Sequence, residues 1–310
     1  MKKKISVIVP IFNEEEVLRE LVLRLDKMRG KESRYEFEFI MVENGSHDGS
    51  YGILKEERQT RPYLKIIRLS KNFFADGAIT AGLHYAKGDA AVIMNADLQD
   101  PPELITEFLT KWEEGYDIVY GRIKRRYGES VLRKVCSSLF YVIINALTKG
   151  LFPRNASDFR LISRKVIDTV KAMNETNRFM RGMIAWTGYS QVGVEFERPA
   201  RFAGKSKSGF RDVFKVALNG IFSFSYFPLT FTTFMGIFMS LASFALMIMF
   251  LALFLAYGRT VPGHASVIVC MLFLFGILFF ILGIIGEYLA RIYDEAKGRP
   301  NFIVSETEGI

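Results

Sequence analysis

A short apolar run ends in a cluster of oxygen-bearing side chains. After Val92–Met94 come, in order, Asn95, Asp97, Gln99, Asp100, Pro101 and Pro102. A run of this length that stops at acids and prolines predicts a buried strand carrying oxygen ligands to the edge of a sheet. Mg²⁺ binds through one or two carboxylates while substrate phosphates and water fill its other positions. The cluster therefore predicts a metal-bridged diphosphate site.

An alternative explains the same acids without a ligand. Asp97 and Asp100 precede a helix that we expect to begin near Pro102, and acids commonly cap helices at such positions. The cluster by itself leaves both interpretations open.

The elements that position this cluster follow from hydrophobic periodicity. Strands are expected at Ile5–Pro10, Phe37–Val42, Leu64–Leu69 and Ala90–Met94, with helices from Asn13 and over Ala78–Ala86. Strands that alternate with helices predict a parallel sheet, which binds ligands at the carboxyl ends of its strands. The loops after Val9, Val42, Leu69 and Met94 should therefore converge.

Two further polar segments could contribute chemistry. Glu43–Ser46 follows the second strand and offers a carboxylate to a base or ribose, although for this loop alone a glycine turn before a helix is the favoured explanation. Asp158 and Arg160 are two residues apart, so they share one side of the chain if the segment is extended.

The C-terminal third is apolar enough to enter a membrane. Residues 229–257 contain no charged side chain, and 265–286 contain none either. At about 1.5 Å per residue, each run exceeds the roughly 30 Å core of a bilayer. We expect two membrane-spanning helices, at 229–257 and 265–289, joined as a hairpin.

The flanking charges predict the orientation of this hairpin. Basic residues outside the spans are Lys205, Lys207, Arg211, Lys215, Arg291, Lys297 and Arg299, whereas the link carries only Arg259. The positive-inside rule places both flanks and the large polar region in the cytoplasm, in a multi-pass protein of the inner or plasma membrane. An exported chain is excluded, because Asn13–Glu16 stands where a signal peptide needs small residues.

Composition limits the partners. The net charge of +8 gathers near the membrane segments, which favours anionic lipid or a lipid phosphate over nucleic acid. Apolar stripes flanked by cations predict amphipathic helices at 131–149 and within 201–228, lying in the membrane interface or packed on a core. The two cysteines, Cys136 and Cys270, argue against a disulfide framework.

Several motifs in this order resemble glycosyltransferase family 2, and specifically its polyprenyl-phosphate glycosyltransferases. They are Val7–Glu14, Gly45–Ser46, Asn95–Glu103, Asp158–Arg160 and the tail Gly286–Glu295 with Arg299–Pro300. The resemblance runs nearly from end to end. It implies a GT-A fold: a Rossmann-like, mostly parallel α/β domain at 1–200, a basic loop and interfacial helix at 201–228, the hairpin, and a cytoplasmic tail at 290–310.

The resemblance also implies roles for individual residues. The nucleotide would be held by Pro10, Phe12, Glu14, Glu43, Ser46, Asn72, Asn95 and Asp97. Mg²⁺ or Mn²⁺ would be held by Asp97, Gln99 and, more weakly, Asn95. Catalysis would use Asp97 and Asp158, and the acceptor phosphate would be gripped by Arg122, Arg133, Ser137, Arg160, Arg201 and Lys205.

This chain departs from the family pattern at two places. Glu43–Asn44 replaces the usual pair of aspartates, and Asn95 replaces the first aspartate of the metal motif. A neutral amide removes a formal charge from the metal site and should weaken cation binding.

The expected activity is an inverting transfer of a sugar from a nucleotide-diphosphate sugar, UDP favoured over GDP, to polyprenyl phosphate. Two alternatives remain: transfer to another lipid such as diacylglycerol, and a degenerate transferase that serves as a membrane scaffold. The sequence leaves a homo-oligomer open and does not identify the sugar.

Overall fold

The structure is a computed structural model that describes residues 2–126, 153, 155–200, 202, 220–257 and 264–310. The predicted helix at 131–149, most of the segment 201–228, and Cys136 lie outside these residues. The described chain divides into two units, residues 1–220 with 299–310, and residues 221–298.

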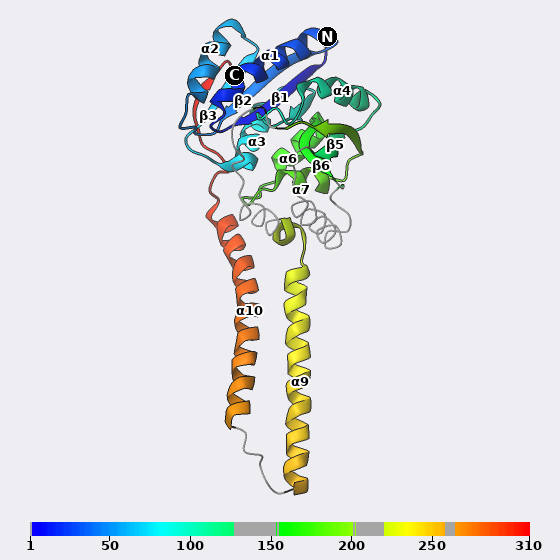
Figure 1. Cartoon of the computed structure of the whole chain (residues 1–310), viewed down its shortest axis with the longest axis vertical. Coiled ribbons are helices and arrows are strands. Elements are labelled where there is room, and N and C mark those ends of the chain that lie inside the picture. The colour runs from blue at the N-terminus through cyan, green and yellow to red at the C-terminus, as the bar shows by residue number, and fades with distance from the viewer. Residues whose placement is uncertain (1, 127–152, 154, 201, 203–219, 258–263) are drawn as a thin grey trace. The chain divides into compact units, whose positions relative to one another are not determined.

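The first unit is a mixed sheet flanked by helices (Figure 1). Its strands are β1 (Lys4–Ile11), β2 (Glu36–Glu43), β3 (Leu64–Leu69), β4 (Ala90–Ile93), β5 (Ile118–Arg126), β6 (Ala156–Ser163), β7 (Gln191–Arg198) and β8 (Val304–Glu308). Its helices are α1 (Glu15–Lys31), α2 (Ser50–Thr60), α3 (Phe74–Tyr85), the 3₁₀ turn η1 (Pro102–Leu104), α4 (Ile105–Glu113), α6 (Arg164–Ala172) and α7 (Met180–Trp186).

The strand order is β7-β5-β6-β4-β1-β2-β3-β8. The run β4-β1-β2-β3 is parallel, as expected from the alternation of strands and helices. β6 and β8 are antiparallel to their neighbours, while β7 runs parallel to β5.

Both faces of the central strand β1 are covered. Ile5, Val7 and Val9 are buried in one cluster with apolar side chains of α1, which recur at helical spacing. On the other face, Ile8 meets α3 so closely that a Cβ on Gly82 would lie 2.3 Å from its Cγ2. A strand covered on both faces needs an apolar residue at almost every position, which explains its continuous hydrophobic run.

The second unit contains the two apolar helices, α9 (Phe227–Tyr257) and α10 (His264–Lys297). The stretches 227–256 and 267–297 are long and apolar enough to cross a membrane, and their large apolar side chains are exposed. Glu287 pairs with Arg291 one turn later, at 3.0 Å.

The C-terminal tail contains a strand that the sequence did not predict. α10 continues to Lys297, and Val304–Glu308 then forms β8, an edge strand of the sheet in the first unit. The hydrophobic pattern did not predict this strand, because its alternating acids and small polar residues suit an exposed edge and carry no apolar signal.

A buried ion pair lies near the amino ends of the central strands. Glu38 is 2% exposed and accepts hydrogen bonds from Lys65 Nζ (2.7 Å), Ser6 Oγ (2.6 Å) and the Lys87 N–H (2.8 Å). Burial alone would raise the pKa of Glu38, but Lys65 and the other donors lower it to about 2.

Replacing Glu38 with Gln should destabilise the domain by about 3 kcal/mol, because Lys65 would keep a buried charge without its partner. Since the folded-state pKa of Glu38 is depressed, its contribution is present above the ordinary value of 4.5 and is lost as the pH falls towards 2. Denaturant unfolding of the full chain in detergent, followed between pH 7 and pH 3, measures both effects.

Glu36→Gln is the matched control. Glu36 is an exposed residue of the same strand that pairs with Lys4 at 3.6 Å. Its loss should change the free energy of unfolding by less than about 1 kcal/mol. Equal effects of the two substitutions would contradict a structural role for the buried pair.

Candidate active site

The carboxyl ends of β1, β2, β3 and β4 lie at one edge of the sheet, and the chain order reverses between β1 and β4. Open α/β sheets bind ligands at such a reversal. Ile8 pairs with Ile93, so the chain leaving β4 starts beside the end of β1. This register brings the Asn95–Asp100 loop close to Pro10 and Phe12.

One residue in each of the four loops at this edge has a positive φ. They are Asn13 (53°), Gly45 (72°), Phe74 (58°) and Leu98 (57°), following β1, β2, β3 and β4 respectively. At Gly45 a Cβ would lie 2.6 Å from the carbonyl carbon of Lys71, so only glycine fits there. Non-glycine residues at such angles store strain, which clusters at functional sites.

The loops after β1 and β2 are cross-linked by hydrogen bonds. The buried Glu43 carboxylate accepts the Ser46 N–H, and its other oxygen lies 3.3 Å from Nε of Arg68. Ser46 Oγ accepts the N–H of Asn13 at 3.0 Å, and Asn13 Oδ1 accepts the N–H of His47 at 2.8 Å. The structure thus brings Glu43 and Ser46 together with the first loop.

The other predicted nucleotide contacts on the first loop are close to this cross-link. Pro10 and Phe12 are partly exposed, and the Phe12 ring lies edge-on to His47 with centroids 6.3 Å apart. Glu14 directly precedes α1, and its N–H donates to Ser50 Oγ at 2.9 Å.

Asn44 joins the loops after β2 and β3. Its Nδ2 donates to Asn72 Oδ1 (3.1 Å) and to the Phe74 carbonyl (3.0 Å), while its Oδ1 accepts the Phe73 N–H (2.8 Å). An aspartate at this position could not donate the first two bonds. The departure from the family turn therefore has a structural reason, and it places Asn72 beside the Glu43 turn.

The Asn95–Asp100 loop is organised by its own acids. Asp100 is fully buried and accepts hydrogen bonds from the Asn95 N–H (3.1 Å) and Nδ2 (2.9 Å), and from Ser157 Oγ (3.3 Å). Asp97 is 6% exposed, and its Oδ1 accepts the Gln99 N–H at 3.2 Å.

This arrangement excludes the helix-capping alternative. The turn η1 begins after Pro101 without a side-chain cap, so neither Asp97 nor Asp100 caps it. Burial raises the pKa of Asp100 to about 6; Arg198 at 3.9 Å opposes this, and the negative charge of Asp97 adds to it. Asp100 thus holds β6 and β7 against the loop that carries Asp97.

The residues present fit a divalent cation. Gln99 Nε2 donates to the Pro199 carbonyl at 3.3 Å and Asn95 Nδ2 donates to Asp100, so both amide oxygens remain as acceptors beside Asp97. These are the hard oxygen ligands that Mg²⁺ and Mn²⁺ prefer. Within the described part of the chain, no three His, Cys, Asp or Glu side chains are grouped to hold a metal, so the remaining ligands would come from phosphate oxygens or water.

Asp158 is held by a two-pronged ion pair. It lies on β6 with a half-exposed side chain, and its oxygens accept from Arg181 Nε (2.8 Å) and Nη2 (2.7 Å). Arg160 lies 3.9 Å away and donates to the Ser157 carbonyl at 3.0 Å. Burial alone would raise the pKa of Asp158, but the charges of Arg181 and Arg160 lower it below its ordinary value.

A second carboxyl group supports this pair. Asp76, in the first turn of α3, accepts the N–H of Met180, the residue before Arg181. Burial raises the pKa of Asp76 to about 6, the Met180 N–H opposes the rise, and the charge of Asp158 adds to it.

The predicted acceptor-phosphate residues divide into two groups. Arg133, Ser137, Arg201 and Lys205 lie outside the described residues. Arg122 is half exposed and lies 3.6 Å from Glu195 on the neighbouring strand, and Arg160 is buried.

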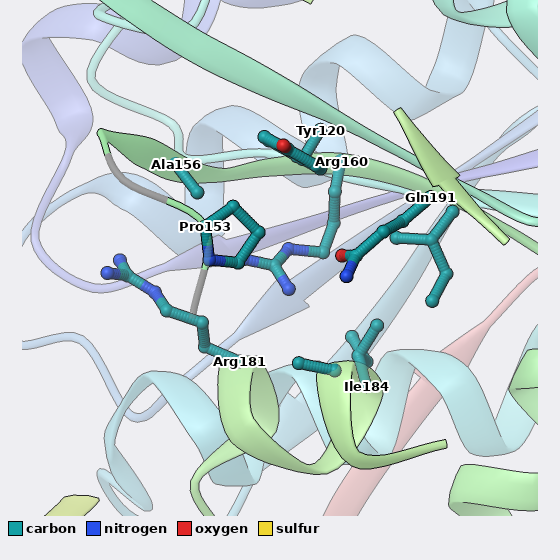
Figure 2. Close-up of a pocket in the computed structure, with 9 residues that line it drawn as sticks. Tyr120, Pro153, Ala156, Arg160, Arg181, Ile184 and Gln191 are labelled. Atoms are coloured by element: carbon teal, nitrogen blue, oxygen red, sulfur yellow. The ribbon is translucent and has the colours of Figure 1, made fainter. Parts of the chain in front are cut away.

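Arg160 also lines a small pocket between β5, β6 and α7 (Figure 2). Its side chain extends between Pro153 and Gln191, and α7 contributes Arg181 and Ile184 to the opposite wall. The cavity has a volume of about 10 Å³, which is room for about one water molecule.

Sequence reasoning missed Arg181 and Asp76 and did not predict that Asp100 would be buried. Arg181 and Asp76 are far from Asp158 in the sequence and belong to no recognisable motif. The sequence assigned Asp100 only as a ligand or a cap, because its burial depends on contacts with β6 and β7 that spacing does not reveal.

Comparison with known proteins identifies the class. The model of Glycosyl transferase family 2 matches residues 6–171, more than half of the chain. An uncharacterized glycosyltransferase of Bacillus subtilis, YkcC, is 43% identical over 98% of this chain and 94% of its own length. The bactoprenol glucosyl transferase derived from the SfII prophage of Shigella flexneri is 35% identical over 98% of each chain.

Solved structures show a more distant likeness. Glucosyl-3-phosphoglycerate synthase from Mycobacterium tuberculosis, in complex with Mn²⁺, uridine-diphosphate-glucose and phosphoglyceric acid, is 16% identical, with a TM-score of 0.47 over 71% of this chain and 78% of that one. Mannosyl-3-phosphoglycerate synthase from Rubrobacter xylanophilus is 15% identical, with a TM-score of 0.48 over 71% and 72%.

The chain belongs to glycosyl transferase family 2 and is a glycosyltransferase. The resemblance seen in its motifs is confirmed, as is the expected fold class, a mostly parallel α/β domain followed by two apolar helices. The roles of individual site residues remain predictions.

Replacing Arg181 with Gln should raise the pKa of Asp158, because the strongest cation favouring its ionised form is removed. If transfer requires ionised Asp158, the acid limb of the pH–rate profile should move to higher pH, and kcat should fall about tenfold as the carboxylate loses its position. Arg181→Lys keeps the positive charge but loses the two-pronged geometry of the guanidinium. The acid limb of its profile should therefore stay near the wild-type pH, whereas its kcat should still fall.

Lys111→Gln, which breaks an exposed pair with Glu114 on α4, is the control and should leave the profile unchanged. An unaltered acid limb in Arg181→Gln would show that Asp158 does not govern the rate.

Proposed function

We propose that this chain transfers a sugar from a nucleotide-diphosphate sugar, UDP-linked in preference to GDP-linked, to the phosphate of a polyprenol in the membrane. The observation that carries the proposal is the acid-bearing loop Asn95–Asp100 at the strand-order reversal, beside the cross-linked Glu43 turn. The bactoprenol glucosyl transferases, similar over almost the whole chain, support a lipid-phosphate acceptor.

The donor would be held by the loops after β1, β2 and β3. Glu43 is a buried carboxylate at this edge, and Asn72 is fixed by Asn44 next to it. Both would form hydrogen bonds with a base or ribose, and Pro10, Phe12, Glu14 and Ser46 would complete the pocket. The loops are already tied together, so little ordering remains to be done on binding.

The leaving diphosphate would lie at Asp97. Asp97, Gln99 and the weaker ligand Asn95 would hold Mg²⁺ or Mn²⁺, which when bound neutralises charge that develops on the diphosphate. Asp100 keeps the loop in place from beneath through its bonds to Asn95.

The state of Asp158 favours a phosphate acceptor. A hydroxyl acceptor, such as diacylglycerol, needs a general base with a pKa near the working pH. Asp158 is instead ion-paired with Arg181, and its pKa is lowered. A phosphate monoester is largely dianionic at neutral pH and attacks without a base, so Asp158 is suited to orienting the sugar or stabilising positive charge at its anomeric carbon.

In-line attack by the phosphate oxygen on the anomeric carbon would invert it, with the bond to the diphosphate breaking on the opposite side. Arg122 and Arg160, with Arg133, Ser137, Arg201 and Lys205, would bind the acceptor phosphate. The apolar helices α9 and α10 would anchor the enzyme in the inner or plasma membrane, with the catalytic unit in the cytoplasm as the basic flanks predict.

The direct test incubates the purified full chain with undecaprenyl phosphate and a panel of UDP- and GDP-sugars, and detects glycosylated lipid by mass spectrometry. Asp97→Ala should lower kcat/KM at least about a hundredfold, because charge on the leaving group would lose its main counterpart. It should also abolish the strengthening of UDP binding by Mg²⁺ or Mn²⁺, measured by titration calorimetry.

Three results would redirect the proposal. UDP binding that no divalent cation strengthens would favour the scaffold alternative. Product formed on diacylglycerol but not on undecaprenyl phosphate would favour the other lipid acceptor. A hydroxyl lipid that accepts sugar from the wild-type chain but not from an Asp158→Asn variant that still binds UDP would indicate that the acid acts as a general base.

A further inference from the structure

The last residues of the chain return to the donor side of the catalytic sheet. β8 pairs antiparallel with β3, with Ile67 opposite Thr307 and Arg68 opposite Glu306. Ser305 Oγ donates to the Arg68 carbonyl at 3.1 Å. The segment 299–310, called here the C-terminal strap, belongs to the first unit although it follows α10 in sequence.

Hydrogen bonding between the strap and β3 continues past the end of β3 into the loop that carries Asn72. The Ser70 N–H donates to the Ile303 carbonyl at 2.9 Å, one residue beyond the end of β3. Two residues later, Asn72 binds Asn44 and accepts the Phe74 N–H at 2.7 Å. The bond to the strap is thus the one that fixes the start of the loop carrying Asn72.

The strap is itself anchored on α3. A Cβ on Gly77 would lie 2.7 Å from Phe73 Cβ and 3.0 Å from the carbonyl oxygen of Asn301, so glycine lets the strap cross the helix closely here. Asn301 Nδ2 donates to the Glu175 carbonyl at 3.1 Å, and the Phe302 ring packs on His84 with centroids 5.9 Å apart.

Charges link the strap to the Glu43 turn. Glu306 and Glu308 lie 3.3 and 3.1 Å from Lys55 Nζ on α2. Lys55 and Arg68 both lie over the ring of Tyr51, at 4.7 and 4.2 Å from its centroid. Arg68 in turn places its Nε 3.3 Å from the buried Glu43 carboxylate.

We propose that the C-terminal strap positions the donor site: it holds the loop Ser70–Phe74 through Ile303, and Arg68 against Glu43 through the strand pairing of β8. The strap acts through these groups and contacts no substrate itself. This inference rests on the proposed function for its effect on donor binding, whereas its effect on the loops is independent of what binds there.

Loss of the strap should weaken donor binding without weakening acceptor binding. Removing the strap would release the loops after β2 and β3 but leave the loop after β4 with its own bonds through Asp100. Donor affinity should therefore fall while acceptor recognition by the basic residues is kept.

The experiment compares the wild-type chain with a deletion of residues 303–310, which removes both Ile303 and β8, and with the double variant Glu306→Gln/Glu308→Gln, all in detergent. UDP binding in MgCl₂ should weaken about tenfold in the deletion and about twofold to threefold in the double variant, because exposed ion pairs contribute little each. The KM for undecaprenyl phosphate should stay within about twofold of the wild-type value. Glu114→Gln, directly after α4, is the control and should match the wild type.

Hydrogen exchange gives a readout that does not depend on a ligand. The amides of Ser70, Phe73 and Phe74 should exchange faster in the deletion, whereas those of Asn95 and Gln99 should not. Unchanged exchange at the first three amides, in a folded deletion protein, would overturn the proposal. If the deletion does not fold, the double variant must show faster exchange at Ser70 and a weaker UDP affinity than the Glu114→Gln control, or the proposal is overturned.

The same experiment separates the two proposals. If the wild-type chain does not bind UDP but the deletion still exchanges faster, the proposed donor is rejected and the positioning role of the strap stands. Normal UDP binding by the deletion, with a normal KM for the sugar donor, would reject the strap but keep the function.

Discussion

The parallel pairing of β1 with β2 on one side and β4 on the other is the constraint on which the rest of the structure depends. It fixes the reversal of strand order between β1 and β4, and so places the carboxyl ends of four parallel strands at one edge. Each loop leaving that edge contains a residue at positive φ, and each is tied to a neighbour or to itself by a buried amide or carboxylate. The site is therefore built before any ligand arrives, as preorganised catalysis requires.

Buried and half-buried carboxylates in this site serve different purposes because their surroundings differ. Burial raises the pKa of Asp100, although Arg198 and the Asn95 N–H oppose the rise, and its hydrogen bonds to Asn95 give it a structural role. Asp158 is open to solvent on one side and clamped by a guanidinium, so it stays ionised. An ionised acid that is already paired is a poor base but a good electrostatic partner for a sugar that develops positive charge. This division of roles agrees with an acceptor that brings its own negative oxygen.

The chain closes on itself around the apolar hairpin. The catalytic sheet is built from residues before α9 and completed by β8 after α10, so both ends of the hairpin are covalently attached to one folded unit. The short polar strand β8 also covers the edge of β3, which would otherwise expose unpaired backbone groups.

The sequence by itself determined the four parallel strands, the two apolar helices and the family, because these depend on local periodicity, length and motifs that no distant contact can alter. Leu64–Leu69, for example, is the strand that its hydrophobic pattern predicted. It also located Glu43, Asp97 and Asp158 at strand ends or on a strand, where they are found.

Only the tertiary structure decided which partners these residues have. Arg181 reaches Asp158 from α7, Asn44 replaces an acid in order to bridge two loops, and a polar tail becomes an edge strand. Each of these depends on contacts between segments far apart in the sequence, and a side chain's charge state and hydrogen bonds are set by such contacts rather than by spacing along the chain.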